Sequence, residues 1–250
     1  MKNTSPAVIT LFSKCPQHAR IEAVPGECLT DMQKYYPVLL NLKRKKCLVV
    51  GGGAVAARKA EDLLDCGASV KVISKQIGGD MKSLVHREGL TLIERPFTEP
   101  DLDGAFLVIA ATGDGELNSN IACLCNKRGI LINVVDDEDL CGFIVPSTLR
   151  RGDLAISVST SGRFAGLSRK IKSEMEPLFP PCCIDILEAL FQLREKVKKN
   201  VRSEKERKEF WDKFFNEVNL LDAFKNDQKS ITNKIGELSG GMEERCPGTE

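Results

Sequence analysis

The chain has 250 residues, of which 42% are hydrophobic, and a formal net charge of +1. This length allows one large domain or two modest ones, and the apolar fraction is sufficient for a core. A nearly neutral chain lacks the overall field that recruits nucleic acid or acidic membranes. Its longest apolar runs, such as residues 106–111, are too short to cross a bilayer. We therefore expect neither a nucleic-acid partner nor a membrane partner.

Cysteine and histidine usage argues against both a disulfide scaffold and a metal site. The ten cysteines are few for 250 residues and lack paired metal-ligand spacing, and there are only two histidines. The sequence predicts reduced thiols, a cytoplasmic location and no metal ligands. Residues 1–31 differ in character from the rest and lack the long apolar segment of a secretory signal. We expect a disordered extension there and a folded unit that begins near Met32.

From residue 35 to residue 137, strand patterns alternate with helix patterns. This alternation predicts right-handed crossovers and a parallel, Rossmann-like sheet in an α/β fold. The predicted strands are residues 46–50, 69–73, 90–97, 106–112 and 130–136. The predicted helices are residues 54–66, a weak helix at 76–89, a turn or short helix at 98–105, and residues 114–129.

The pattern then changes, because residues 142–160 read as two strands around a turn at 150–153. Helices are predicted at residues 164–179, 183–200 and 203–224, and the polar remainder is expected to be flexible. The expected domains are the extension 1–31, a Rossmann domain 32–139, a small strand region 140–163, a helical domain 164–225 and a tail 226–250.

The sequence GGGAVA, residues 51–56, fits the dinucleotide pattern G-x-G-x-x-A and lies between a strand and a helix. Gly51 permits the tight turn, Gly53 lets a pyrophosphate approach the backbone, and Ala56 lets helix and strand pack closely. The helix amino terminus offers N–H groups and a positive dipole to the phosphates. The alternative is an ordinary strand–helix turn.

No carboxylate follows the second strand, where one would bind the ribose hydroxyls of NAD. Lys75 in that position is compatible with the 2′-phosphate of NADP or with a solvated surface lysine, so spacing leaves the cofactor open. The expected cofactor-binding residues are Gly51, Gly53, Ala54, Val55, Ser74, Lys75, Gln76 and Thr112.

Four motifs occur in order: the stretch from YYPVLL to SVKVIS, then FLVIAAT, INVVDD and FIVPSTLRRGDLAISVSTSG. Together they resemble the precorrin-2 dehydrogenase family, which includes the amino-terminal part of sirohaem synthases, over residues 35–175. The resemblance implies NAD-dependent oxidation of precorrin-2 to sirohydrochlorin in sirohaem or cobalamin biosynthesis, with Fe²⁺ or Co²⁺ insertion in some members. It also implies NAD as the cofactor and a homodimer joined through the region of residues 143–160.

The resemblance places the family's proposed catalytic aspartate on Asp136, just after the fifth predicted strand. One carboxylate there would accept protons during oxidation and during metal insertion. The substrate is rich in carboxylates, for which arginine is the best partner. Candidate clamps are Arg150, Arg151, Arg163 and Arg169.

This chain departs from many family members after the two strands. Phe164 and Ala165 replace a serine–proline pair, and Thr160 falls where some members carry a regulatory serine. Two other functions compete with the dehydrogenase: a non-catalytic NAD-sensing module, and a tetrapyrrole carrier without catalysis. Asp136 and the paired strand motif favour the dehydrogenase.

Overall fold

A computed structural model describes residues 35–225 and 228–243. The expected extension at residues 1–31 and the start near Met32 lie outside the described residues. In the described part, no helix is long and apolar enough to cross a membrane.

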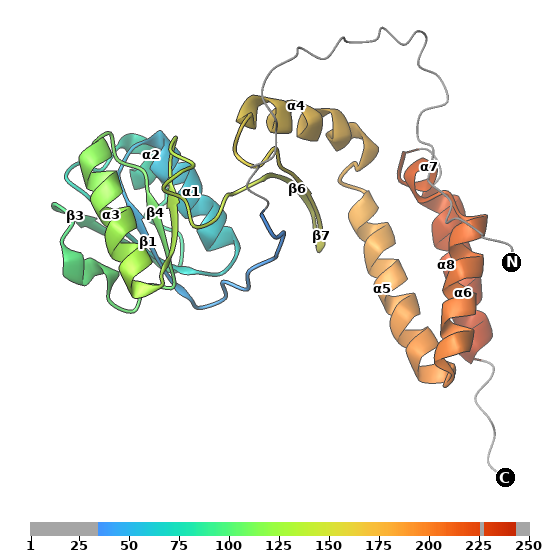
Figure 1. Ribbon diagram of the computed structural model, residues 1–250. Helices are drawn as coiled ribbons and strands as arrows, with labels where there is room; N and C mark the ends of the chain where they lie inside the picture. The colour runs from blue at the N-terminus through green and yellow to red at the C-terminus, as the bar shows by residue number, and fades with distance from the viewer. Residues whose placement is uncertain (1–34, 226–227, 244–250) are drawn as a thin grey trace, which may run out of the picture. The chain divides into compact units, whose positions relative to one another are not determined.

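A five-stranded parallel sheet forms the first part of the fold, as the alternation predicts (Figure 1). Its strand order is β3-β2-β1-β4-β5, so the chain reverses direction across the sheet between β1 and β4. Ligands of open α/β sheets bind at such a reversal, beyond the carboxyl ends of the strands. The strands are β1 (Lys46–Val50), β2 (Ser69–Ser74), β3 (Leu90–Glu94), β4 (Leu107–Ala110) and β5 (Leu131–Val134).

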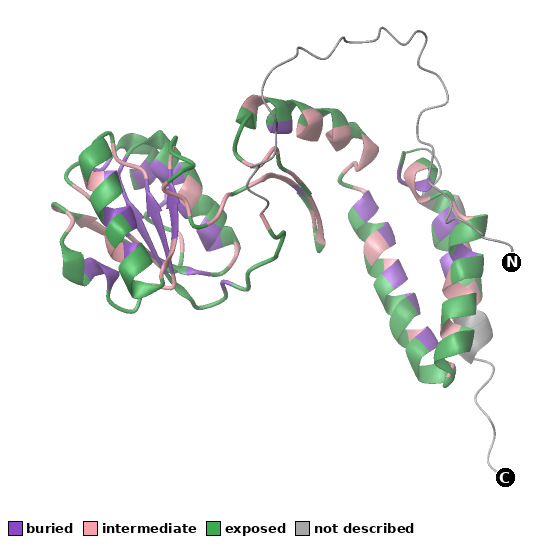
Figure 2. Ribbon diagram, viewed as in Figure 1, coloured by how far each residue is buried: buried purple, intermediate pink, exposed green. Residues whose placement is uncertain are grey.

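Helices cover both faces of this sheet, which explains why its central strand β1 carries apolar residues toward both faces. Along β1, Cys47 and Val49 belong to the core under α1 (Ala54–Asp65) and α2 (Gly79–Lys82). Leu48 and Val50 belong to the opposite core, under η1 (Glu99–Leu102) and α3 (Gly115–Arg128). Figure 2 shows the resulting buried strands between exposed helix faces.

The predicted helix at residues 76–89 is mostly wrong. Only Gly79–Lys82 is helical, because two adjacent glycines and a short connection to β3 leave room for a single turn. The alternative short helix at residues 98–105 is confirmed as η1.

The two strands predicted next form an antiparallel hairpin, β6 (Ser147–Arg151) and β7 (Leu154–Val158). Its two-residue loop is Gly152–Asp153, and Gly152 has a φ of +57°. Tight hairpin loops favour glycine because they require positive φ.

Helices make up the rest of the described chain. They are α4 (Ala165–Met175), η2 (Glu176–Leu178), α5 (Cys183–Asn200), α6 (Glu204–Glu217), α7 (Leu220–Lys225) and α8 (Gln228–Glu243). Two expectations are corrected. The helix predicted over 203–224 is interrupted at Val218–Asn219. Within the segment predicted as a flexible tail, residues 226–250, Gln228–Glu243 instead form a helix, α8, whose Ile231 and Ile235 are buried in the core that α5 helps to form. Residues 226–227 and 244–250 of that predicted tail lie outside the described residues.

Candidate functional site

The glycine loop joins β1 to α1 at the reversal point of the sheet. Gly51 has a φ of +130°, and its amide donates to the carbonyl of Ile73 at 2.9 Å. A Cβ on Gly51 would lie 2.3 Å from the carbonyl oxygen of Ala111. Both the conformation and the space therefore require glycine at this position.

Gly52 is equally constrained, although the dinucleotide pattern leaves its position free. A Cβ there would lie 2.1 Å from the carbonyl oxygen of Gln76 and 2.8 Å from Ser74 Oγ. The amide of Gly78 also donates to the carbonyl of Gly52 at 3.0 Å. The loop thus packs against the turn after β2. The only sequence signal for this packing is that the middle residue of the three is also glycine.

Gly53 differs from its two neighbours because it is exposed, and a Cβ there would meet nothing within 4 Å. It is the N-cap residue of α1, it makes no side-chain cap, and the first turn of α1 contains no acidic residue. Ala54 and Val55 are exposed beside it. The amide groups at this helix terminus are therefore suited to an anion, as the pyrophosphate of a dinucleotide requires.

The residues that follow β2 form a turn held by Ser74. Its Oγ donates to the carbonyl of Gln76 at 2.7 Å and accepts from the Gln76 amide at 3.3 Å. The side chain of Lys75 is exposed at the tip of this turn. Of the three residues predicted to bind the cofactor here, Ser74 thus shapes the turn, and Lys75 brings a positive charge to the strand end.

Thr112, after β4, belongs to a local network with Asn118, which sequence reasoning missed. Thr112 Oγ1 donates to Asn118 Oδ1 at 2.6 Å, and Asn118 Nδ2 donates to the carbonyl of Thr112 at 3.1 Å. Asp114 caps α3 by accepting from the Leu117 amide at 3.0 Å. These bonds fix the strand end that faces the glycine loop across the reversal point. Asn118 was missed because no spacing rule marks a buried amide on a helix.

Asp136 comes two residues after β5, at the same edge of the sheet as the glycine loop. It is exposed, and its φ is +63°, a left-handed conformation that aspartate and asparagine tolerate better than most residues. The neighbouring Asp137 has a different role, since its Oδ1 accepts from the Leu140 amide at 3.3 Å and closes the turn. The structure thus separates a free carboxylate from a structural one within the run DDED.

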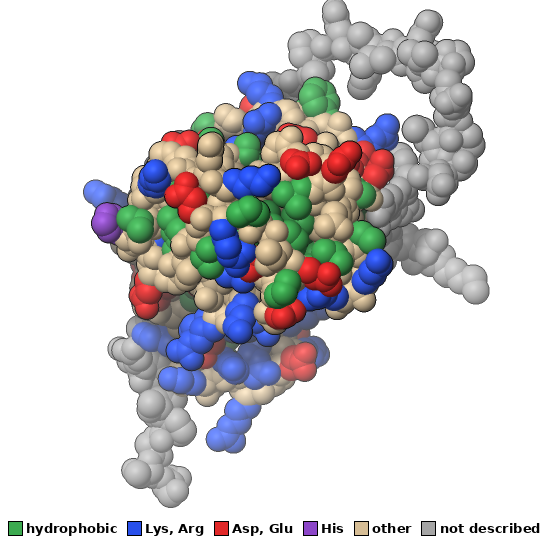
Figure 3. Space-filling view, turned by 90° about the vertical axis from the view of Figure 1, so that its left-hand side faces the viewer, with side chains coloured by type: hydrophobic (Ala, Val, Ile, Leu, Met, Phe, Trp, Pro, Cys, Tyr) green, Lys and Arg blue, Asp and Glu red, His purple; other side chains and the backbone are tan. Residues whose placement is uncertain are grey.

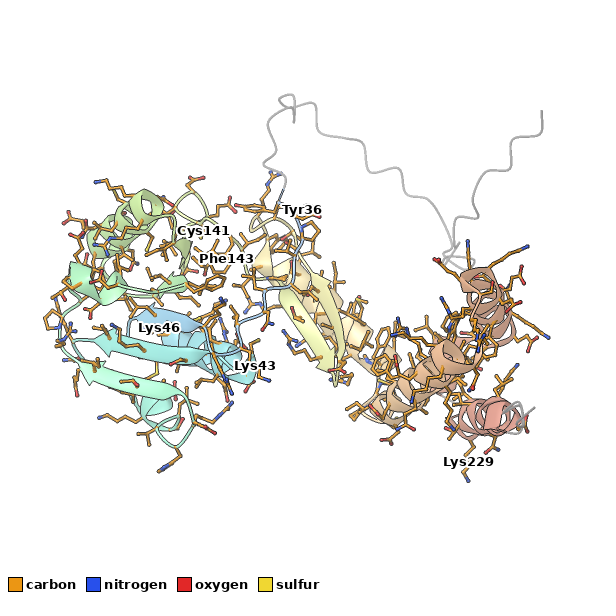
Figure 4. All side chains as sticks on the ribbon, turned by 90° about the horizontal axis from the view of Figure 1, so that it is seen from below. Tyr36, Lys43, Lys46, Cys141, Phe143 and Lys229 are labelled. Atoms are coloured by element: carbon orange, nitrogen blue, oxygen red, sulfur yellow. The ribbon has the colours of Figure 1, made fainter. Side chains whose placement is uncertain are left out.

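After Asp136 the chain folds back onto β5, which is an edge strand of the sheet. Cys141 Sγ accepts from the Val134 amide at 3.2 Å and lies 3.1 Å from the carbonyl oxygen of Asp137, to which it donates. Asn133 Nδ2 donates to the carbonyl of Phe143 at 3.0 Å. Figure 4 shows Cys141 and Phe143 close together beside the sheet. Burial raises the pKa of the Cys141 thiol, as do the nearby charges of Asp137 and Glu138.

The four candidate arginines do not form one cluster in the structure. Arg150 lies near Cys66, with 3.9 Å from its guanidinium to Sγ, at the end of α1 opposite the glycine loop. Arg151 is occupied, because its Nε donates to the carbonyl of Phe179 at 2.7 Å. Arg169 is exposed on α4.

Arg163 follows a residue, Gly162, that lies beside the turn carrying Asp136. It is exposed, and a Cβ on Gly162 would lie 2.4 Å from Glu138 Oε2. Thr160 lies at the start of the turn that contains Gly162 and Arg163 and leads into α4. Its Oγ1 accepts from the Phe164 amide at 3.1 Å and lies 3.2 Å from the buried Ser168 Oγ. The Thr160 hydroxyl therefore stabilises the entry into α4.

Basic and acidic side chains are interspersed over the near face of the molecule in Figure 3. Among the described residues, no group of three His, Cys, Asp or Glu side chains is arranged to hold a metal ion.

Comparison with known proteins identifies the relatives of this chain. A domain model described as putative NAD(P)-binding matches residues 38–147. Siroheme synthase of Neisseria meningitidis serogroup B is 37% identical over 210 residues, which cover 84% of this chain and 43% of that protein. Over most of its length the chain is thus homologous to part of siroheme synthase. Siroheme synthase 1 of Serratia proteamaculans is also 37% identical, over 72% of this chain and 38% of that protein.

The chain spans less than half the length of these curated relatives. A solved structure described as SirC, precorrin-2 dehydrogenase, shares the fold with a TM-score of 0.65 at 22% sequence identity. That likeness covers 81% of this chain and 100% of the solved one. The α/β fold and the family resemblance predicted from the sequence are confirmed.

Proposed function

We propose that this chain catalyses the NAD-dependent oxidation of precorrin-2 to sirohydrochlorin. The observation that carries the proposal is the position of an exposed carboxylate, Asp136, at the same strand-end edge as an open dinucleotide loop at Gly53. The oxidation removes a hydride, which the nicotinamide accepts, and a proton, for which a base is needed. The homology with siroheme synthases over most of this chain supports the same activity.

The residues present fit a dinucleotide. Gly53, Ala54 and Val55 would hold the pyrophosphate at the terminus of α1, and the turn Ser74–Gln76 would contact the adenosine ribose. Thr112 would border the nicotinamide half. We propose NAD as the cofactor on the strength of the family resemblance, although the charge of Lys75 is also compatible with NADP.

Asp136 acts in this proposal as the general base that receives the substrate proton. Its exposure keeps the carboxylate accessible, and its turn presents it beyond the sheet edge. Exposed Arg163 and Arg169 would bind substrate carboxylates. Metal insertion would use the same base, since the pyrrole nitrogens must lose protons before they bind Fe²⁺ or Co²⁺.

We also propose that two copies of the chain associate through the hairpin β6–β7. A two-stranded hairpin is marginal on its own, and this one has two unpaired edges in a single chain. Sedimentation that gives only a monomer of 27.5 kDa would contradict this association.

The central test is Asp136→Asn, assayed by the absorption spectrum of precorrin-2 with NAD⁺ and, separately, with NADP⁺. Asparagine tolerates the left-handed backbone but cannot accept the proton, so we expect turnover to fall by about a hundredfold or more. Binding of NAD⁺ should be nearly unchanged. Parallel reactions of sirohydrochlorin with Fe²⁺ or Co²⁺ test metal insertion.

The matched control is Asp137→Asn, because the amide oxygen can still accept from the Leu140 amide. It should retain most of the activity. Full activity of Asp136→Asn would show that the base lies elsewhere. NAD⁺ binding by the unmodified protein without any turnover of precorrin-2 would favour the NAD-sensing module over the dehydrogenase.

A further inference from the structure

The turn that carries Asp136 is held by two side chains that sequence motifs do not mark. We propose that the Cys141 thiol and the Asn133 amide are positioning residues that hold the Asp136 carboxylate in place for proton transfer. This inference rests on the proposed function, in which Asp136 is the base. In this proposal the Cys141 thiol holds the turn and does not itself react.

The thiol ties the end of β5 to the far side of the turn. Cys141 Sγ accepts from the Val134 amide at 3.2 Å, and its single proton is directed at two carbonyl oxygens, Asp137 at 3.1 Å and Val134 at 3.3 Å. One small side chain therefore bonds the backbone both before and after Asp136. All three distances lie within hydrogen-bonding range for sulfur.

Asn133 holds the segment that returns along β5 after the Asp136 turn. Its side chain is buried, and Nδ2 donates to the Phe143 carbonyl at 3.0 Å and to Cys141 Sγ at 3.4 Å. Phe143 in turn packs against the core on the α1 side of the sheet. Since the next residue, Val134, belongs to the opposite core, Asn133 points to the same side of the sheet as Phe143.

The backbone on either side of Asp136 is consequently fixed. The Val135 amide donates to the Ala110 carbonyl of β4 at 2.9 Å, and the Asp137 carbonyl is bonded by the thiol. Asp136 itself has a φ of +63°, a conformation that neighbouring bonds must maintain. Because a displacement of about 1 Å can cost a factor of 10² in rate, these bonds matter to catalysis.

The chemistry of the thiol suits this task. Burial raises the pKa of Cys141, so the group keeps its proton at neutral pH and can donate a hydrogen bond. A protonated, half-buried thiol is also a poor nucleophile. Cys141 is thus better suited to holding the turn than to reacting with substrate.

The first test compares steady-state turnover of precorrin-2 by Cys141→Ala and Cys141→Ser. We expect Cys141→Ala to lower kcat by about 10- to 100-fold with little change in the KM for NAD⁺, because only the base is displaced. Cys141→Ser keeps a donor and an acceptor and should restore most of the rate. The control is Cys125→Ala, which removes a buried thiol from α3 and should leave kcat near that of the unmodified protein.

A double substitution distinguishes positioning from general damage to the fold. In the Asp136→Asn background, the base is already absent, so Cys141→Ala should cause no further loss of kcat. A loss of the same factor in both backgrounds would overturn the proposal, since the thiol would then act independently of Asp136. Equal rates for Cys141→Ala and the unmodified protein would also overturn it.

A measurement that needs no turnover keeps this inference separate from the proposed function. Hydrogen exchange of the peptide spanning residues 134–142 should become faster in Cys141→Ala, stay slow in Cys141→Ser and be unaffected by Cys125→Ala. Unchanged exchange in Cys141→Ala would refute the holding role. If the unmodified protein fails to oxidise precorrin-2, the proposed function is refuted, and exchange alone then decides whether the thiol holds this turn.

Discussion

Replacing Gly53 by aspartate should make the protein more stable while removing cofactor binding. Gly53 is the N-cap residue of α1, with φ of −83° and ψ of −179°, and a Cβ there meets nothing within 4 Å. Aspartate is among the best N-cap residues, whereas glycine leaves the first amides of the helix without a side-chain partner. The substitution should add about 0.5–1 kcal/mol from the cap and the helix dipole.

The same carboxylate would occupy the place of the pyrophosphate. Two like charges about 4 Å apart repel by about 4 kcal/mol at an effective dielectric constant of about 20, which corresponds to roughly a thousandfold in affinity. Since Gly53 is exposed, solvent and salt reduce this repulsion. We expect NADH affinity to fall by a factor of about 10² to 10³, measured by fluorescence titration. Thermal unfolding without cofactor should occur about 1–4 °C higher.

Two further variants separate charge from shape and one glycine from another. Gly53→Asn has the shape of aspartate without the charge, so it should cap α1 and lose much less affinity. Gly52→Ala should instead destabilise the fold by about 1–3 kcal/mol, because its Cβ would lie 2.1 Å from the Gln76 carbonyl. NADH binding by Gly53→Asp equal to that of the unmodified protein would refute the assignment of this loop to a dinucleotide.

Two other predictions concern stability. The paired, charge-assisted bonds from Arg95, at 2.7 and 2.8 Å, hold the pKa of buried Asp101 well below its usual range. Asp101→Asn should therefore lower the free energy of unfolding by about 2 kcal/mol at pH 7. Chemical denaturation should show this difference shrinking as the pH falls below about 4, where the carboxyl of the unfolded chain becomes protonated. A difference that does not change with pH would contradict the assignment. Ile235→Ala should lower the free energy of unfolding of the C-terminal helices by about 2–4 kcal/mol, measured by the fluorescence of the single tryptophan, Trp211. The exposed control, Glu237→Ala, should leave that stability unchanged. No effect of Ile235→Ala would show that α8 does not pack.

The parts of the fold that the sequence predicts well depend on local rules. The apolar run at β1 is buried on both faces, so it carries a strong strand pattern without alternation. The end of α3 is marked by Gly129, which adopts a φ of +66° as a C-terminal cap. The hairpin β6–β7 is marked by the turn residues Gly152 and Asp153 between two predicted strands.

The C-terminal helices depend instead on contacts between distant segments. Ile231, Ile235 and Leu238 of α8 are spaced three and four residues apart, yet the surrounding sequence is polar and ends in glycines. That segment has little helical tendency of its own, and helices of this length are marginal in isolation. Its helix is stabilised by the apolar stripe of α5, which ends at Asn200, well before α8 begins at Gln228. A local pattern therefore suggests a tail where packing produces a helix.

The candidate site shows the same division more sharply. Three consecutive glycines look alike in the sequence, but Gly51 and Gly52 are required by neighbouring carbonyl oxygens, and Gly53 alone faces open space. Likewise, Asp136 and Asp137 are adjacent carboxylates, and only the bond to the Leu140 amide makes the second one structural. Cys141 is five residues from Asp136 and carries no motif, because its role arises from the return of the chain onto β5. The strand ends locate the reacting groups from sequence, whereas the atoms that hold those groups in place become evident only from tertiary hydrogen bonds.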